Sequence, residues 1–268
     1  MAYSASPIID HFAGPIGQAR LSLEDVFATR VSEFCHAGHS IFWEGDVASD
    51  TFRVSEGVLR LYRILPDGRR AITGFAFPGD VLGLAFHDRY FYTAEAVTTV
   101  RLRRFPHGRL QALAADCPHL HYEILQVIAN ELGAAQEQMV LLGQKSAEER
   151  VASFLLMNGL RVAKDRSAPI VFDLPMTRLD MADYLGLTIE TVCRAVTKLR
   201  QAGLVSLEGR HKVFLHKPDE LARFAGQDDS GCPGMIKVTH QASWPRHAMA
   251  NLNDELEPAA SRTCDHSH

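Results

Sequence analysis

The sequence predicts an α+β fold in three consecutive parts: an antiparallel β-domain, one long amphipathic helix and a compact unit that contains a helix-turn-helix. Three observations predict it. Short alternating apolar runs broken by Gly, Pro and Asp fill residues 30–106, as in a sandwich or barrel. A helical apolar repeat follows in residues 117–145. Residues 146–226 then show the order helix, glycine-containing turn, helix and hairpin.

Length and composition are those of an ordinary folded protein. The chain has 268 residues, of which 46% are hydrophobic and 22% charged, which excludes a wholly disordered or fibrous chain. No apolar run approaches the roughly 18 residues of a membrane span. The first ten residues lack the basic start and apolar stretch of a secretory signal. We therefore expect a cytoplasmic protein, with a flexible arm at residues 1–20 and a disordered tail at residues 227–268.

Cysteines and charge narrow the class of protein further. Five cysteines are scattered over the chain without a CxxC pair, which excludes a disulfide framework, a zinc knuckle and an obvious cysteine-ligated cluster. The formal net charge is −4, yet residues 186–217 carry six Lys or Arg against two Glu. A basic segment inside an acidic protein is typical of a face that binds nucleic acid.

The β-domain is predicted for residues 21–116. An extended run at residues 57–64 is followed by the turn residues Asp67 and Gly68 and by a second run at residues 71–77. An Asp-Gly pair between two such runs is a hairpin signal. We expect an antiparallel β-roll.

The predicted long helix, residues 117–145, carries a narrow apolar seam. Its members recur at alternating steps of three and four, as in a coiled coil: Leu125, Ile128, Leu132, Ala135, Met139 and Leu142. Packing on the chain's own β-domain would also explain an apolar stripe. A strict seam is narrower than a core-facing helix needs, however, and Ala135 permits close backbone approach. We therefore favour a homodimer formed through this helix.

The C-terminal unit carries helix start and stop signals in close succession. Ser146 begins a capping-box pattern that opens one helix. Thr177 opens a short helix that ends near Gly186, and Thr188 can cap the next helix. Two short strands follow within residues 204–215. This order predicts a winged helix-turn-helix.

The second helix of this motif, residues 189–201, carries the side chains suited to reading DNA. Glu190, Cys193 and Arg194 stand at i, i+3 and i+4 and so share one face. Arg can fork onto guanine, and Glu can accept a hydrogen bond from cytosine. Nearby residues suit contacts to the DNA backbone: Thr177, Thr188, Thr191, Lys198, Arg210 and Lys212. An ordinary ion pair on the helix surface is the alternative for Glu190 and Arg194, which the basic wing disfavours.

At these motifs the sequence resembles the CRP/FNR transcription regulators. The likeness lies in Ala147-Glu-Glu-Arg-Val-Ala-Ser-Phe154, Ala182-Asp-Tyr-Leu-Gly-Leu-Thr-Ile-Glu-Thr-Val-Cys-Arg194 and Phe77-Pro-Gly-Asp80, and it covers about residues 30–225. The resemblance implies a cyclic-nucleotide-binding-like jelly roll, a dimerisation helix and a winged helix-turn-helix. It is strongest to the FixK-like activators of microoxic, respiratory and nitrogen-fixation genes.

The resemblance also implies partners and roles. Family members with the pattern Glu-x-x-Ser-Arg read a palindromic double-stranded site of the TTGA type, and here Cys193 replaces the serine. Glu190 and Arg194 would read C and G, and Cys193 would touch a neighbouring base. Activation implies contact with RNA polymerase, for which the hairpin at residues 66–70 is a candidate.

Two departures from the family concern the β-domain. FNR-type oxygen sensors hold an iron–sulfur cluster, but no cysteine precedes Cys35 and the β-domain cysteine position is Arg103. Cyclic-AMP receptors bind ribose through an acid and phosphate through an arginine, but these segments read Gly83-Leu-Ala85 and Tyr92-Thr93. We therefore expect no cofactor and an effector-independent regulator. A regulator gated by an unknown small ligand in the β-roll is the alternative.

Two further hypotheses concern thiol and imidazole groups. Cys193 lies near a helix N-terminus and beside Arg194, which favours the thiolate, so its oxidation would lower DNA affinity. A core cysteine is the alternative. A cupin-like metalloenzyme is a distant alternative, because four candidate ligands occur in the β-domain: His36, His39, Glu44 and His87. Residues three apart on a strand point to opposite faces, however, so His36 and His39 would not converge without a bend. We therefore expect neither a metal site nor an enzyme.

Overall fold

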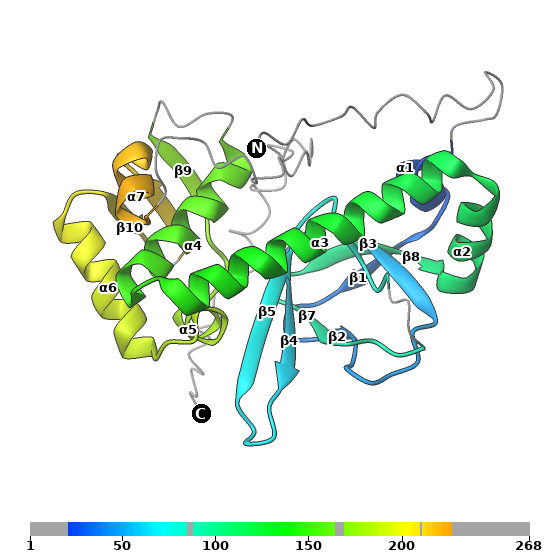
Figure 1. The fold of residues 1–268 in the computed structure, drawn as a ribbon, viewed down its shortest axis with the longest axis horizontal. Helices are drawn as coiled ribbons and strands as arrows, with labels where there is room; N and C mark the ends of the chain where they lie inside the picture. Colours follow the sequence, from blue (N-terminus) through cyan, green and yellow to red (C-terminus); the bar gives the residue numbers. More distant parts are fainter. Residues whose placement is uncertain (1–20, 85–87, 164–168, 210, 227–268) are drawn as a thin grey trace, which may run out of the picture.

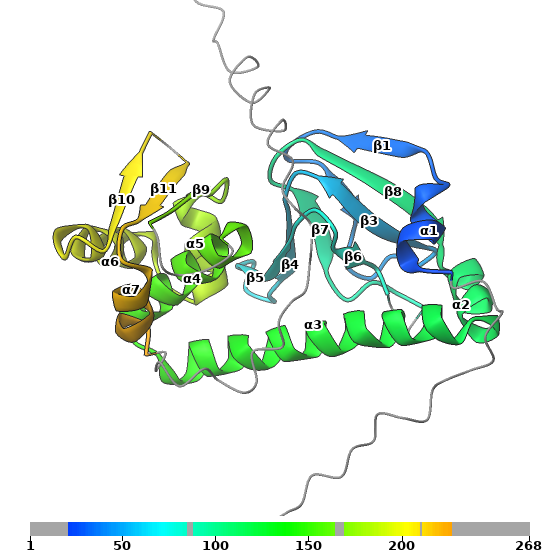
Figure 2. The same ribbon diagram turned by 90° about the horizontal axis from the view of Figure 1, so that it is seen from above.

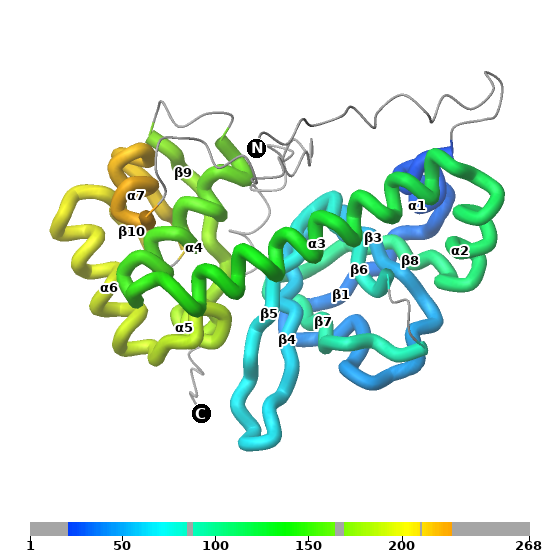
Figure 3. The backbone as a smooth tube through the Cα atoms, in the orientation of Figure 1, coloured from blue at the N-terminus to red at the C-terminus, as the bar shows by residue number. Residues whose placement is uncertain are grey.

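The computed structural model describes residues 21–84, 88–163, 169–209 and 211–226. It confirms the α+β class, with an N-terminal β-domain, the long helix α3 (Pro118–Gln144) and a C-terminal domain. In Figures 1 and 3, α3 runs along most of the molecule, with the β-domain beside one half and the C-terminal domain at the other end. Figure 2 shows that both domains lie on the same side of α3.

The β-domain consists of two four-stranded antiparallel sheets. One sheet has the order β1 (Ser32–Cys35), β8 (Val100–Pro106), β3 (Asp50–Glu56) and β6 (Val81–Leu82). The other has the order β2 (Ser40–Phe42), β7 (Thr93–Ala96), β4 (Leu59–Ile64) and β5 (Arg70–Ala76). Alternate residues such as Phe52, Leu59 and Val100 are buried in their common core, as the period of two predicted.

The predicted hairpin is β4 and β5. Leu59 pairs with Ala76 and Ile64 with Arg70. Gly68 has a φ of 82° in the connecting turn, a backbone conformation that glycine adopts without steric cost. Figure 1 shows this hairpin extending from the β-domain beside the C-terminal domain.

Two short helices pack between the β-domain and the start of α3, and the sequence did not predict them. They are α1 (Leu23–Ala28) and α2 (His107–Asp116). Phe27, Leu110 and Leu120 bury their side chains together in one apolar cluster. The first half of α3 is thereby anchored to its own β-domain.

The C-terminal domain is a winged helix-turn-helix with one more strand than predicted. Its elements are α4 (Ala147–Val162), β9 (Ile170–Asp173), α5 (Arg178–Leu185), α6 (Ile189–Gln201), β10 (Val205–Glu208), β11 (Lys212–Leu215) and α7 (Pro218–Phe224). The wing sheet has the order β10-β11-β9. The prediction of a two-stranded wing omitted β9, because four alternating residues are too short for a reliable period.

None of the helices described in residues 21–226 combines the length and the apolar character that crossing a bilayer requires.

Candidate nucleic-acid interface

The helix-turn-helix consists of α5 and α6, and local sequence determines both helix ends. Thr177 and Thr188 are the N-caps, and each hydroxyl accepts a hydrogen bond from a backbone N–H three residues later. Gly186 ends α5 with a φ of 62°, a left-handed conformation suited to glycine. The turn therefore delivers α6 in a fixed direction. These cap predictions are confirmed.

Helix α6 has one buried and one open face. Val192, Val196 and Leu199 are buried in the domain core. Glu190, Cys193 and Arg194 are exposed, as their spacing predicted. A shallow hollow of about 500 Å³ lies on the open face and is lined by Cys193, Arg194, Thr197, Lys198 and Gln201. The structure thus leaves the side chains chosen from the sequence free to meet a ligand.

Charges at the start of α6 suit contact with bases. The backbone N–H of Glu190 and the Thr188 hydroxyl hydrogen-bond the Glu190 carboxylate and lower its pKa, so it is ionised near neutral pH and can accept from a base amino group. Arg194 Nη2 donates to Thr191 Oγ1 at 3.2 Å. The Arg194 guanidinium therefore lies along the exposed helix surface, where its hydrogen bond to Thr191 is itself exposed to solvent.

Apart from Thr177, the predicted backbone-contact residues that the structure describes lie on α6 and in the wing. Thr188 and Thr191 share a hydroxyl contact of 3.1 Å at the start of α6. Lys198 lies one turn beyond Arg194 and pairs with Glu148 of α4 at 3.1 Å. Lys212 lies in the wing strand β11 and is exposed. Arg210 lies outside the described residues.

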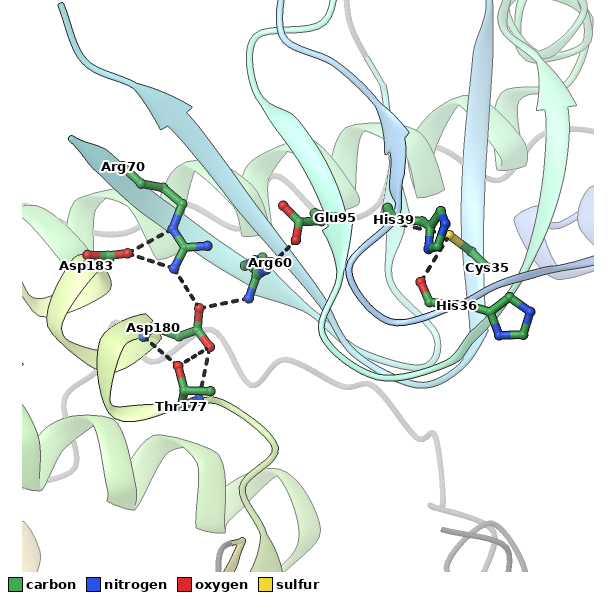
Figure 4. A network of polar contacts seen from close by, with 9 residues as sticks. All are labelled: Cys35, His36, His39, Arg60, Arg70, Glu95, Thr177, Asp180 and Asp183. Atoms are coloured by element: carbon green, nitrogen blue, oxygen red, sulfur yellow. Dashed lines mark hydrogen bonds and ion pairs between the residues drawn. The ribbon is translucent and has the colours of Figure 1, made fainter. Parts of the chain in front are cut away.

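Thr177 is placed differently from the other predicted backbone contacts. Its Oγ1 donates to Asp180 Oδ2 at 2.7 Å and accepts from Asp180 N at 3.1 Å. Figure 4 shows that this pair faces Arg60 and Arg70 of the β-domain. The hydroxyl is therefore occupied at the junction between the two domains.

The seam of α3 is largely uncovered by its own chain. Leu125, Leu132, Met139 and Leu142 are 47%, 60%, 65% and 38% exposed. Ala135 is also exposed, whereas Ile128 packs on the α1–α2 cluster. Burial against the β-domain therefore explains only Ile128.

Arg150 links three helices and was not singled out from the sequence. It donates to the carbonyl oxygens of Lys145 at 2.9 Å, Leu142 at 2.8 Å and Leu185 at 3.0 Å. These are carbonyls near the C-terminal ends of α3 and α5, which lack partners within a helix. Its position in a predicted helix gave no sign of partners on two other elements.

In the β-domain, Tyr92 packs between the strands and α3. Its ring lies 5.6 Å from that of Phe42, and its hydroxyl hydrogen-bonds the backbone of Gly83. Burial beside Glu131 of α3 raises the pKa of the phenol well above its usual range. A neutral phenol therefore stands where the family resemblance puts a phosphate-binding arginine.

The two histidines of the cupin-like alternative lie at a bend of the chain. His36 and His39 do not lie on one strand but flank the turn between β1 and β2, where their ring centroids are 6.3 Å apart (Figure 4). Cys35 is beside them, and burial raises the pKa of its thiol. His87 lies outside the described residues. Among the residues the structure describes, no group of three or more His, Cys, Asp or Glu is placed to hold a metal ion.

Comparison with known proteins identifies the family. The model of the cyclic nucleotide-binding domain matches residues 33–117, and that of the Crp-like helix-turn-helix domain matches residues 149–224. The nitrogen fixation regulation protein FixK of Bradyrhizobium diazoefficiens is 43% identical over 171 residues, which make up 64% of this chain and 72% of that protein. The chain belongs to the CRP/FNR family of transcription regulators.

Two further relatives agree with this CRP/FNR assignment. The transcriptional activator protein FnrL of Cereibacter sphaeroides is 36% identical over 199 residues, 73% of this chain and 80% of FnrL. The solved structure of FixK2 from Bradyrhizobium japonicum matches with a TM-score of 0.69 and 34% identity, covering 73% of this chain and 96% of that one. This CRP/FNR protein is a FixK/FNR-like DNA-binding transcription activator. The homologues are regulators and not enzymes, so the cupin-like alternative is wrong.

Proposed function

We propose that two copies of this regulator bind a TTGA-type palindrome through a dimer formed along α3. The observation that carries the proposal is the exposed apolar seam of α3 together with the uncovered reading face of α6. Four large seam side chains are at least 38% exposed. A contiguous apolar stripe in water is costly unless a partner covers it, and a second copy offers the matching stripe.

In this proposal, α6 reads the half-site in the major groove. Arg194 donates to guanine, the ionised Glu190 accepts from cytosine, and Cys193 contacts a neighbouring base. Backbone contacts, which add affinity without sequence information, come from Thr188, Thr191, Lys198, Arg210 and Lys212. Thr177 is not included, because its hydroxyl and its backbone N–H both donate to Asp180 Oδ2 and leave no donor for a DNA phosphate.

The dimer itself is tested by sedimentation. The parent protein is expected to sediment as a dimer, and Leu132→Glu as a monomer, because the substitution places two carboxylates in the seam. Val171→Glu is the matched control, since Val171 is an exposed apolar residue of the wing, 45% exposed and outside the seam. A parent that is monomeric both alone and on a palindromic duplex contradicts the proposal.

The gene class and a contact with RNA polymerase are part of the proposal. The FixK proteins are named for nitrogen fixation regulation, and we infer that this regulator activates genes of microoxic respiration or nitrogen fixation. The exposed tip of the β4–β5 hairpin, residues 66–69, is the proposed contact with RNA polymerase. Arg70 is directed to α5 instead.

The β-domain is proposed to act without cyclic AMP or an iron–sulfur cluster. Tyr92, bonded to the Gly83 backbone, supports this, because a neutral phenol cannot replace the charge of a phosphate-binding arginine. A change in palindrome affinity upon addition of cyclic AMP would contradict it. An unknown small ligand in the β-roll stays the alternative.

Oxidation of Cys193 is proposed to weaken DNA binding. The thiol is exposed and lines the hollow beside Arg194, so a charged sulfur acid there would face DNA phosphates. Peroxide is expected to reduce the affinity of the parent but not of Cys193→Ser. Equal loss in both proteins would refute a role for this thiol.

A further inference from the structure

A cluster of charged side chains joins the β-domain to α5. Asp180 is fully buried. Its Oδ1 accepts from Arg60 Nη1 and from Arg70 Nη2, each at 3.0 Å. Arg70 Nε also donates to Asp183 Oδ2 at 2.8 Å, and Arg60 pairs with Glu95. Two arginines of β4 and β5 thus hold two aspartates of the helix-turn-helix (Figure 4).

The contact between the two arginines and α5 is built into the interior of the protein, between the two domains. The second oxygen of Asp180 accepts from the backbone N–H and the hydroxyl of Thr177, at 2.9 Å and 2.7 Å, and so caps α5. A carboxylate removed from water needs charged partners, and Arg60 and Arg70 of the β-domain are such partners. Aromatic rings extend the contact. The ring centroid of Phe75 in β5 lies 5.5 Å from that of Tyr184 in α5 and 6.1 Å from that of Phe154 in α4.

The other end of α5 is held by α3 and α4. Gln138 Nε2 of α3 donates to the Tyr184 carbonyl at 2.7 Å, and Arg150 of α4 donates to the Leu185 carbonyl at 3.0 Å. Helix α6 begins at Ile189, after a short turn, and packs on α5. A tilt of α5 would therefore move α6 relative to α3.

We propose that Arg60 and Arg70 are positioning residues for DNA binding, whose buried contact with α5 fixes the recognition helix relative to α3. The inference rests on the dimer and readout proposed above. The contact leaves Glu190, Cys193 and Arg194 exposed, so docking does not cover the reading face. In a palindromic complex the two recognition helices lie about 34 Å apart, a spacing that depends on how each α6 is held on α3.

A charge exchange between Arg70 and Asp183 tests this positioning. Both side chains are partly exposed, at 21% and 18%, so exchange is compatible with folding. Arg70→Asp places a third carboxylate beside Asp180 and Asp183. The double variant Arg70→Asp with Asp183→Arg restores the charge balance. Arg63→Asp is the control, because Arg63 lies on the neighbouring strand β4 of the same hairpin and pairs with Glu44 of the β-domain.

Two readouts are made on each full-length protein: affinity for the palindromic duplex at constant salt, and hydrogen exchange of the α5 amides. Arg70→Asp is expected to lose about tenfold in affinity, within the range known for coupling between sites, and to exchange faster in α5. The double variant is expected to recover the affinity and the slow exchange of the α5 amides. Arg63→Asp is expected to change neither the affinity nor the exchange. Such a recovery is not expected of a merely destabilising substitution.

Three results would overturn the inference. They are unchanged affinity in Arg70→Asp, tighter binding that marks the contact as inhibitory, and a folded double variant that recovers nothing. If Arg70→Asp does not fold, Arg70→Gln with Arg60→Gln replaces it, and unchanged affinity or tighter binding of that variant overturns the inference. If the parent itself fails to prefer the palindrome, the proposed function fails. Hydrogen exchange then still decides whether the arginines hold α5.

Discussion

Adding a methyl group to Gly159, in the interior of α4, is predicted to lower the stability of the protein. A Cβ at this position would lie 2.7 Å from Leu215 Cδ1, 3.2 Å from Phe172 Cε1 and 3.4 Å from Ile170 Cγ2. All three partners are buried side chains of the wing sheet. In Gly159→Ala the buried Leu215 side chain or α4 itself must therefore shift, although alanine is the better helix former.

The two effects have opposite signs and can be compared. Overpacking a close-packed core costs about 1–3 kcal/mol, and replacing a helical glycine with alanine gains about 0.5–1 kcal/mol. The net expectation is a loss of about 1 kcal/mol in the free energy of unfolding. If the C-terminal domain, whose elements span residues 147–224, unfolds as one unit, that loss lowers its melting temperature by roughly 4–8 °C.

Thermal unfolding followed by circular dichroism checks this value, with Gly108→Ala as the control. Gly108 also lies in a helix, α2, but a Cβ there meets no atom within 4 Å. We expect Gly108→Ala to leave the melting temperature unchanged or slightly raised. An unchanged or higher melting temperature for Gly159→Ala would refute the packing of α4 on the wing described here.

Three other predictions concern the interface and its supports. Arg150→Ala removes three hydrogen bonds to helix-end carbonyls. We expect it to lower the free energy of unfolding, measured in a denaturant titration, by about 2–3 kcal/mol. A decrease below about 0.5 kcal/mol would mean that water replaces these hydrogen bonds. Arg194→Ala is expected to abolish the preference for a G·C over an A·T pair in the half-site, worth about 1–3 kcal/mol, and retained preference in fluorescence anisotropy would contradict the assigned readout. Hydrogen bonds from the Ser146 backbone and hydroxyl lower the pKa of Glu149 below its usual 4.5; its cap is therefore fully formed above about pH 4.5 and is lost as the pH falls through the lowered value. The melting temperature of Glu149→Gln is expected to fall less steeply on acidification below about pH 4.5, and identical acid limbs would exclude this contribution.

Local signals predicted much of the fold. The caps at Ser146, Thr177 and Thr188 and the glycine at 186 fixed helix ends correctly, because a cap depends on residues three or four positions apart. The hairpin turn at Gly68 was equally local. Short elements such as α1, α7 and β9 escaped prediction, since tertiary packing stabilises them more than their own sequence does.

The contacts that position the site could not be found in this way. Arg60 and Asp180 are 120 positions apart in the chain, and Arg70 and Asp183 are 113 apart. No periodic pattern pairs residues at such distances, and each arginine alone suits an exposed strand position. Helical spacing did place Glu190 and Arg194 on one open face, but it could not show that Thr177 faces the β-domain.

The most direct test of the account is binding of the purified, reduced protein, in air and without added ligand, to a duplex carrying TTGA and its inverted repeat. A scrambled duplex at the same salt concentration is the reference, because salt alone changes such affinities by orders of magnitude. We expect binding to the palindrome at least about 1,000-fold tighter than to the scrambled duplex. Equal, weak binding to both duplexes would contradict it.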